Sequence, residues 1–116
     1  MTVVFVALAG AAGVLARYAI SSPFHGPTLP WVTVAINVVG SFALGTLVAA
    51  HWATPELRTA LGVGFLGGFT TFSTFSVQAF LDFDAGRSGT ALLYVAASVV
   101  LGIAAAAGGY ATGKAL

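Results

Sequence analysis

The amino-acid sequence predicts an all-α membrane protein with four transmembrane helices, and three observations support this. Of the 116 residues, 59% are hydrophobic and only 6% are charged, with a mean hydropathy of +1.01, whereas a soluble domain carries about 25% charged residues. Four apolar stretches are each long enough to cross a bilayer, which takes about 20 residues. The connections between them are short, so we expect a single domain over residues 1–116.

The first spanning segment is expected at residues 3–20, with Arg17 near its far end. A short apolar N-terminal stretch is also typical of a secretory signal peptide, which carries basic residues before its apolar core. No basic residue precedes this core, and Arg17 and Tyr18 follow it, so the sequence favours a membrane helix.

The second segment is expected at residues 31–52, with Trp31 and Trp52 at its two ends. Tryptophan is enriched at both membrane–water interfaces, so this pair predicts a span that reaches from one interface to the other. The third and fourth segments are expected at residues 60–81 and 90–112. The connections read SSPFHGPTLP, ATPELRT and DFDAGRSG, which leaves no room for a soluble domain.

The third segment contains the uncharged polar run GGFTTFSTFS at residues 67–76. A helix in lipid must satisfy its own backbone groups, because hydrocarbon offers no hydrogen-bond partners. Paired glycines followed by threonines predict that this helix is broken at Gly67–Thr71, where hydroxyls can bond the freed amides or freed carbonyls can face an ion. Interruptions of this kind mark the ion or substrate site of many transport proteins.

The positive charges predict an unusual topology. With four crossings, Arg58 and Lys114 lie on one side of the membrane and Arg17 and Arg87 on the other. Orientation follows the excess of Lys and Arg on the cytoplasmic side, and here neither side has an excess. The balance predicts insertion in both directions and an antiparallel, dual-topology homodimer. The alternative is that Arg17 lies inside the bundle and does not count, which would leave a slight bias.

Polar side chains recur at helical spacing inside the segments, where such residues are rare. Taken singly, each is explained by hydrogen bonds that hold helices together, worth about 0.6 kcal/mol each. Taken together with an interrupted helix, they favour a lined path through the membrane. The stripes are Thr33, Asn37 and Ser41 in the second segment, Tyr94, Ser98 and Gly102 in the fourth, and Phe72 with Phe75 in the third, where Ser73 and Thr74 project elsewhere.

Small residues four positions apart predict close helix packing, since they let backbones approach in lipid. Such pairs are more often seams within one protomer than a dimer contact. Because four short helices enclose little interior, we expect oligomerisation rather than a monomeric pore. The pairs are Ala9 with Gly13, Ser41 with Gly45, and Ser98 with Gly102.

The charge inventory favours a small anion as the transported species. No acid lies at membrane depth, because Glu56 is in a connection and Asp82 and Asp84 end the third segment. Cation and proton pathways normally keep an acid within the membrane. Amide and hydroxyl donors are available instead, together with phenylalanine rings, whose positive edges attract anions. The net charge of +1 suggests no nucleic-acid partner.

Three motifs resemble those of the Fluc/CrcB family of fluoride channels: GFLGGFTTFSTFS at residues 64–76, GxxGxxxRY at residues 10–18, and INVVGSFALG at residues 36–45. The similarity covers nearly the whole chain, and the third-segment motif is the specific one. It implies an antiparallel dual-topology dimer with two pores in the cell membrane, which lets fluoride leave the cytoplasm passively down its gradient.

The resemblance also implies roles for individual residues. It places a structural Na+ at the dimer centre, bound by backbone carbonyls of Gly67 and Thr70 from each protomer. Phe72 and Phe75 would present ring edges to fluoride, and Asn37 would donate an amide hydrogen bond. The adjoining polar track would be Ser73, Thr74, Tyr94 and Ser98, with Arg17 near a vestibule or in a structural role.

Two positions depart from the family pattern. Gln78 stands where a glutamate is often found, so the conduction rate or gating is expected to differ. Gly102 replaces a hydroxyl residue and shortens the polar track by one group. Whether the chain pairs with itself or with a paralogue of opposite orientation stays open.

Rival classes fit the sequence less well. A small multidrug transporter is also a four-helix dual-topology dimer, but it depends on a buried glutamate in its first helix, and no acid precedes Glu56 here. A non-conducting membrane subunit would need only the packing glycines. An enzyme is not expected, because His25 and His51 lie near connections and no nucleophile–base spacing is visible.

Overall fold

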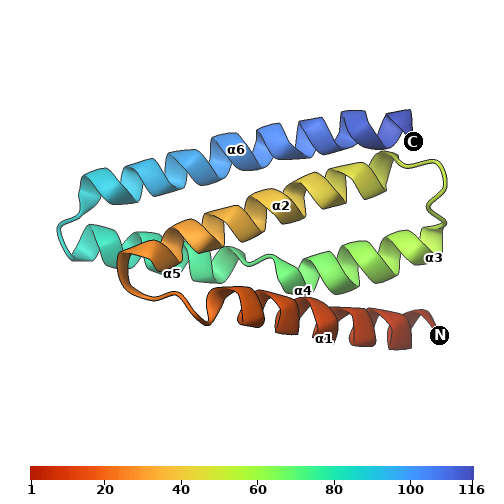
Figure 1. Ribbon diagram of the computed structural model, residues 1–116, viewed down its shortest axis with the longest axis horizontal. Helices are drawn as coiled ribbons and strands as arrows, with labels where there is room; N and C mark the ends of the chain where they lie inside the picture. The colour runs from red at the N-terminus through yellow and green to blue at the C-terminus, as the bar shows by residue number, and fades with distance from the viewer.

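The computed structural model describes residues 1–116 and contains helices only (Figure 1). Four segments are long and apolar enough to cross a membrane, judged by length and composition, which confirms the predicted number. The helices are α1 (Thr2–Ser21), η1 (Gly26–Thr28), α2 (Leu29–Ala49), α3 (Pro55–Arg58), η2 (Thr59–Leu66), α4 (Gly67–Phe69), α5 (Phe72–Asp84) and α6 (Ser88–Ala115). The third spanning segment runs from α3 to α5.

The four segments run roughly along one another in a flat slab with extents of 47 × 29 × 19 Å. In Figure 1 they follow the order α6, α2, third segment and α1, and both chain termini lie at the same end. α2 packs mainly on α6, whereas α1 packs on η2 and α4. The long axis exceeds the roughly 30 Å thickness of a hydrocarbon core.

The second helix ends earlier than predicted. α2 stops at Ala49, and Ala50 is extended, so Trp52 lies in the following turn with 54% of its surface exposed. The apolar run continues past the helix, and hydrophobicity alone does not show where the backbone leaves helical geometry. Trp31 does lie within α2, where its ring meets Tyr94 edge-on at 6.0 Å.

The third segment is irregular in the middle. Thr59–Leu66 forms a π-helix, and Gly67, Gly68 and Phe69 then continue as α-helix. Thr70 and Thr71 are extended, and α5 starts at Phe72 with the Thr71 hydroxyl as its N-cap. The paired glycines are thus helical themselves. A Cβ on Gly68 would lie 2.6 Å from the Gly10 carbonyl oxygen, so this position serves close packing against α1.

Glycine lets helices approach closely at several other points within the chain. A Cβ on Gly13 would lie 2.1 Å from the Phe65 oxygen, and one on Gly45 would lie 2.4 Å from the Ala106 oxygen. Two of the predicted small-residue pairs are therefore seams within one protomer. The third is not a close contact, because the nearest atom to a Cβ on Gly102 is the Ser41 hydroxyl at 4.0 Å.

Candidate functional site

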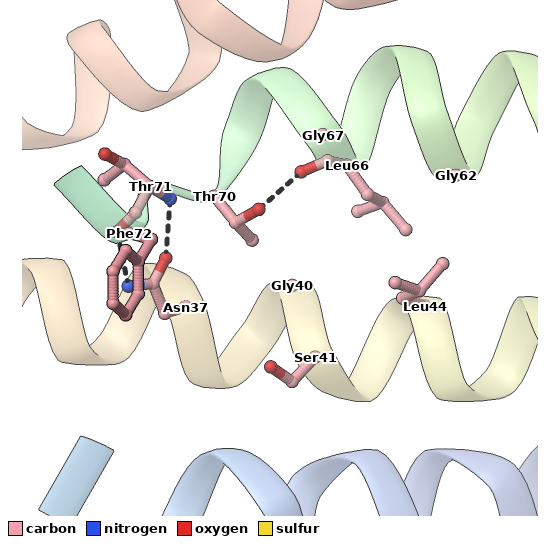
Figure 2. Close-up of a pocket in the computed structure, with 10 residues that line it drawn as sticks. All are labelled: Asn37, Gly40, Ser41, Leu44, Gly62, Leu66, Gly67, Thr70, Thr71 and Phe72. Atoms are coloured by element: carbon pink, nitrogen blue, oxygen red, sulfur yellow. Dashed lines mark hydrogen bonds between the residues drawn. The ribbon is translucent and has the colours of Figure 1, made fainter. Parts of the chain in front are cut away.

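The two extended residues of the third segment are bonded by a side chain from α2. Asn37 Nδ2 donates to the Thr71 carbonyl oxygen at 3.0 Å, and Asn37 Oδ1 accepts from the Thr71 N–H at 2.9 Å. Figure 2 shows the amide facing the Thr71 backbone. One short side chain thus satisfies both backbone polar groups of a residue outside any helix.

Side chains also bond two of the carbonyls that precede Thr70. The Thr70 hydroxyl donates to the Leu66 oxygen at 2.8 Å, as Figure 2 shows. From α1, Arg17 Nε donates to the Gly68 oxygen at 3.2 Å. Arg17 therefore contacts the third segment directly. This hydrogen bond is compatible with the structural role that the sequence left open for Arg17.

Two carbonyl oxygens lose the donors that a continuous helix would give them. The Thr71 N–H would return to Gly67 in an α-helix, but it bonds Asn37 instead. The Thr74 N–H would return to Thr70, but it bonds the Thr71 hydroxyl at 3.2 Å. The two carbonyls freed in this way, those of Gly67 and Thr70, are the ones the resemblance assigned to a cation.

A cavity of about 280 Å³ lies between α2 and the third segment at this point (Figure 2). Among the predicted site residues, it brings together Asn37, Gly67, Thr70 and Phe72. Thr33 is absent from its lining, since this residue is buried one turn away and donates to Leu29 of its own helix. The full lining is Asn37, Gly40, Ser41, Leu44, Gly62, Leu66, Gly67, Thr70, Thr71 and Phe72.

The two phenylalanines predicted for the pore differ in environment. Phe72 is 78% exposed, whereas Phe75 packs against the core of Val34, Ala79 and Tyr94. The ring centroids of Phe75 and Tyr94 are 5.0 Å apart, and those of Phe72 and Phe75 are 5.9 Å apart. Phe75 therefore contacts both the ring of Phe72, which lines the cavity, and the buried tyrosine of α6.

A second group of predicted residues lies nearer the turn between α5 and α6. The Tyr94 hydroxyl donates to Gln78 Oε1 at 3.1 Å, and the Ser98 hydroxyl donates to the Tyr94 carbonyl at 2.9 Å. Gln78 and Tyr94 line a cavity of about 440 Å³ with Asp82, Arg87 and other residues of α2, α5 and α6. Ser73 is exposed, and the half-buried Thr74 accepts from the Thr71 hydroxyl at 3.0 Å.

Two contacts near the candidate site were not predicted from the sequence. Thr71 was treated as part of the polar run, and nothing in the sequence pairs it with a residue 34 positions away. Asp82 was expected to end the third segment, but its buried carboxylate also accepts from Arg87 at 2.8 Å. Opposite charges five residues apart across a short turn were the available signal for that ion pair.

These features define the class of the protein: it is a multi-pass α-helical membrane protein whose uncharged polar side chains meet between the segments. The family described as CrcB-like protein, Camphor Resistance (CrcB), matches residues 4–110, and the chain belongs to this family.

Several curated relatives are similar over nearly the whole chain, and each is named fluoride-specific ion channel FluC. The Rhizobium etli (strain CIAT 652) relative is 46% identical, covering 96% of this chain and 94% of its own. The Rhodospirillum centenum relative is 46% identical, with 96% and 90% covered, and the Geobacter sulfurreducens relative is 43% identical, with 86% of each chain covered. The family is one of ion channels and not of enzymes, as the sequence predicted.

Proposed function

We propose that this chain is a fluoride-selective channel of the cell membrane, through which cytoplasmic fluoride leaves passively down its electrochemical gradient. The observation that carries the proposal is the 46% identity, over 96% of the chain, to a relative named as a fluoride-specific ion channel. The chemistry of the contacts agrees with it, because the polar groups between the segments are amides and hydroxyls without a buried basic cluster. Such dipoles can replace the hydration shell of a small anion.

The fluoride path would run along the residues assigned to it from the sequence: Asn37, Phe72, Ser73, Thr74, Phe75, Tyr94 and Ser98. Asn37 can take part although it bonds Thr71, because an amide nitrogen carries two hydrogens and only one is used here. The edges of Phe72 and Phe75 would supply positive partial charge. Gln78 accepts from Tyr94 and would orient that hydroxyl at the end of the path.

A structural Na+ at the dimer centre is the second part of the proposal. The freed carbonyls of Gly67 and Thr70 support it, since hard cations prefer oxygen ligands and each protomer would supply two. No group of three or more His, Asp or Glu side chains could bind a metal in this structure. Backbone oxygens are the ligands that we propose at this position.

An antiparallel homodimer, or a dimer with a paralogue, would complete the site. Phe72, Ser73 and the Gly67 backbone are exposed in the single chain. Polar groups such as the Ser73 hydroxyl and the freed Gly67 carbonyl normally face protein or water at membrane depth. A second copy packed on this face would cover them and would contribute its own phenylalanines, giving two pores. The balanced positive charges on the two sides support the antiparallel arrangement.

Fluoride efflux from proteoliposomes tests the channel proposal. We expect rapid efflux of fluoride under a gradient, with chloride retained. Phe75→Ile should reduce efflux strongly, because it removes the ring edge while keeping a large apolar side chain. Phe80→Ile on the same helix is the matched control, since Phe80 is 63% exposed and lies outside the assigned path, and it should conduct like the wild type.

The same assay separates the rival classes. A small multidrug transporter would move organic cations under a proton gradient and leave fluoride inside. A non-conducting subunit would leave the vesicles tight to all of these ions. Assembled protein that retains fluoride would overturn the proposal, whereas equal flux through both phenylalanine variants would overturn only the assignment of Phe75.

A further inference from the structure

The contact between Asn37 and Thr71 does more than place a donor next to an anion path. The Asn37 amide uses both its acceptor and one of its donors on the same backbone residue, at 2.9 and 3.0 Å. Asparagine carries a carbonyl oxygen and an NH₂ group in one plane, so it can bond a backbone N–H and C=O at once. An ionised carboxylate, which has no donor, cannot reproduce this pair of bonds.

Neighbouring groups on the third segment are already occupied and cannot replace the amide. The Thr70 hydroxyl donates to Leu66, and the Thr71 hydroxyl donates to Thr74. Without Asn37, the Thr71 N–H would have no partner at this depth, which is costly in hydrocarbon. The nearest remedy is the helical one, in which the Thr71 N–H returns to the Gly67 carbonyl.

A short side chain can reach Thr71 only because α2 lies very close to the third segment. One turn along α2 from Asn37, Gly40 is buried, and a Cβ there would lie 2.2 Å from Thr70 Cγ2. Gly40 therefore brings the two backbones together, and the Asn37 amide spans the remaining gap.

We propose that Asn37 is a positioning residue that holds the third segment open at Thr70 and Thr71. By capturing the Thr71 N–H it keeps that donor from the Gly67 carbonyl, which is then available to a small cation. The statement about the cation rests on the proposed function, whereas the statement about the backbone does not. Asn37 thus links α2 to the cation site without binding the cation itself.

Backbone NMR in lipid nanodiscs tests the proposal directly. Thr70–Thr71 is the only Thr–Thr pair in the sequence. Threonine labelled with ¹³C′ and ¹⁵N therefore gives one carbonyl-to-amide correlation, from the Thr70 carbonyl to the Thr71 N–H. We expect the wild-type signal to have extended-backbone shifts, and Asn37→Ala to move it away from them.

Two further variants separate the hydrogen bonds from packing. Asn37→Asp keeps the shape, but when ionised it lacks the donor for the Thr71 carbonyl, so the signal should differ from the wild type at alkaline pH. At acidic pH the protonated carboxyl has both a donor and an acceptor, and the wild-type signal should return. Thr33→Val, one turn away on α2, removes a hydroxyl that bonds only its own helix and should leave the signal unchanged.

A Thr71 signal that is the same in the wild type, Asn37→Ala and ionised Asn37→Asp would overturn the proposal. So would an equal disturbance by Thr33→Val, or an Asn37→Asp signal that ignores pH. If Asn37→Ala does not fold, Asn37→Asp alone decides. The experiment needs neither fluoride nor flux, so a failure of fluoride efflux would overturn the channel proposal and not this one. Sodium added to the wild type should shift the Thr70 carbonyl, and in Asn37→Ala it should not.

Discussion

The contact between Gly40 and Thr70 gives a quantitative test of how α2 is held against the third segment. In Gly40→Ala the new Cβ would lie 2.2 Å from Thr70 Cγ2, whereas carbon atoms in contact prefer about 3.5–4.0 Å. Overpacking of this kind costs about 1–3 kcal/mol. Rotating Thr70 away would break its 2.8 Å hydrogen bond to Leu66, which costs about 1 kcal/mol. The gain in helix propensity from Gly to Ala, about 1 kcal/mol, partly hides the effect in the single variant.

A double-mutant cycle removes that ambiguity. Thr70→Ser deletes Cγ2 and keeps the hydroxyl, so the alanine methyl of Gly40→Ala can occupy the vacated volume. We expect Gly40→Ala/Thr70→Ser to be more stable than the sum of the two single changes by about 1–3 kcal/mol. Unfolding in mixed detergent micelles, followed by the fluorescence of the two tryptophans, measures this. If the stability changes of the two single variants add to that of the double variant within about 0.5 kcal/mol, the contact is refuted. Fluoride efflux that is reduced in Gly40→Ala should recover in the double variant.

Three other predictions concern packing, charge and the cation. Gly109→Ala should destabilise the protein by about 1–3 kcal/mol relative to Gly108→Ala in the same unfolding assay. The reason is that a Cβ on Gly109 lies 2.1 Å from a backbone oxygen, whereas one on the adjacent Gly108 lies 3.9 Å from the nearest side-chain atom. Asp82→Asn should cost about 1 kcal/mol at low salt and less at high salt, because the Arg87 partner is largely exposed, and Asp84→Asn should be neutral by comparison. Replacing Na+ by a large organic cation on both sides of the membrane should impair fluoride efflux, and unchanged flux would contradict the proposed carbonyl site.

Hydrophobicity alone was enough to predict the number of spanning segments and most of their extent. α1 and α6 start and end within a few residues of the predicted bounds, because no proline interrupts them. The π-helix at Thr59–Leu66, which packs against α1, was not predicted, since π-helices are rare and hydrophobicity does not distinguish them from α-helices. The end of α2 was misplaced because the apolar run continues to Trp52, three residues past the end of the helix at Ala49.

The candidate site was only partly predictable. Sequence reasoning selected Asn37, Tyr94 and the threonines of the polar run as important, because polar groups are rare in such segments. It could not tell that Asn37 bonds Thr71 or that Tyr94 bonds Gln78, since these pairs depend on how the helices are aligned along one another. That alignment is set by backbone contacts at glycines such as Gly13 and Gly45, whose partners in space are not visible in a linear pattern.

The bond between Asn37 and Thr71 has a consequence for how the protein is made. Synthesis proceeds from the N-terminus, so α2 leaves the ribosome before the third segment. In lipid without α2 beside it, the third segment would either leave the Thr71 N–H unpaired, at a cost of several kcal/mol, or close the break by returning that N–H to the Gly67 carbonyl. We therefore expect the extended form at Thr70 and Thr71 to arise only once α2 lies beside the third segment, so that α2 acts as a template for the segment made after it.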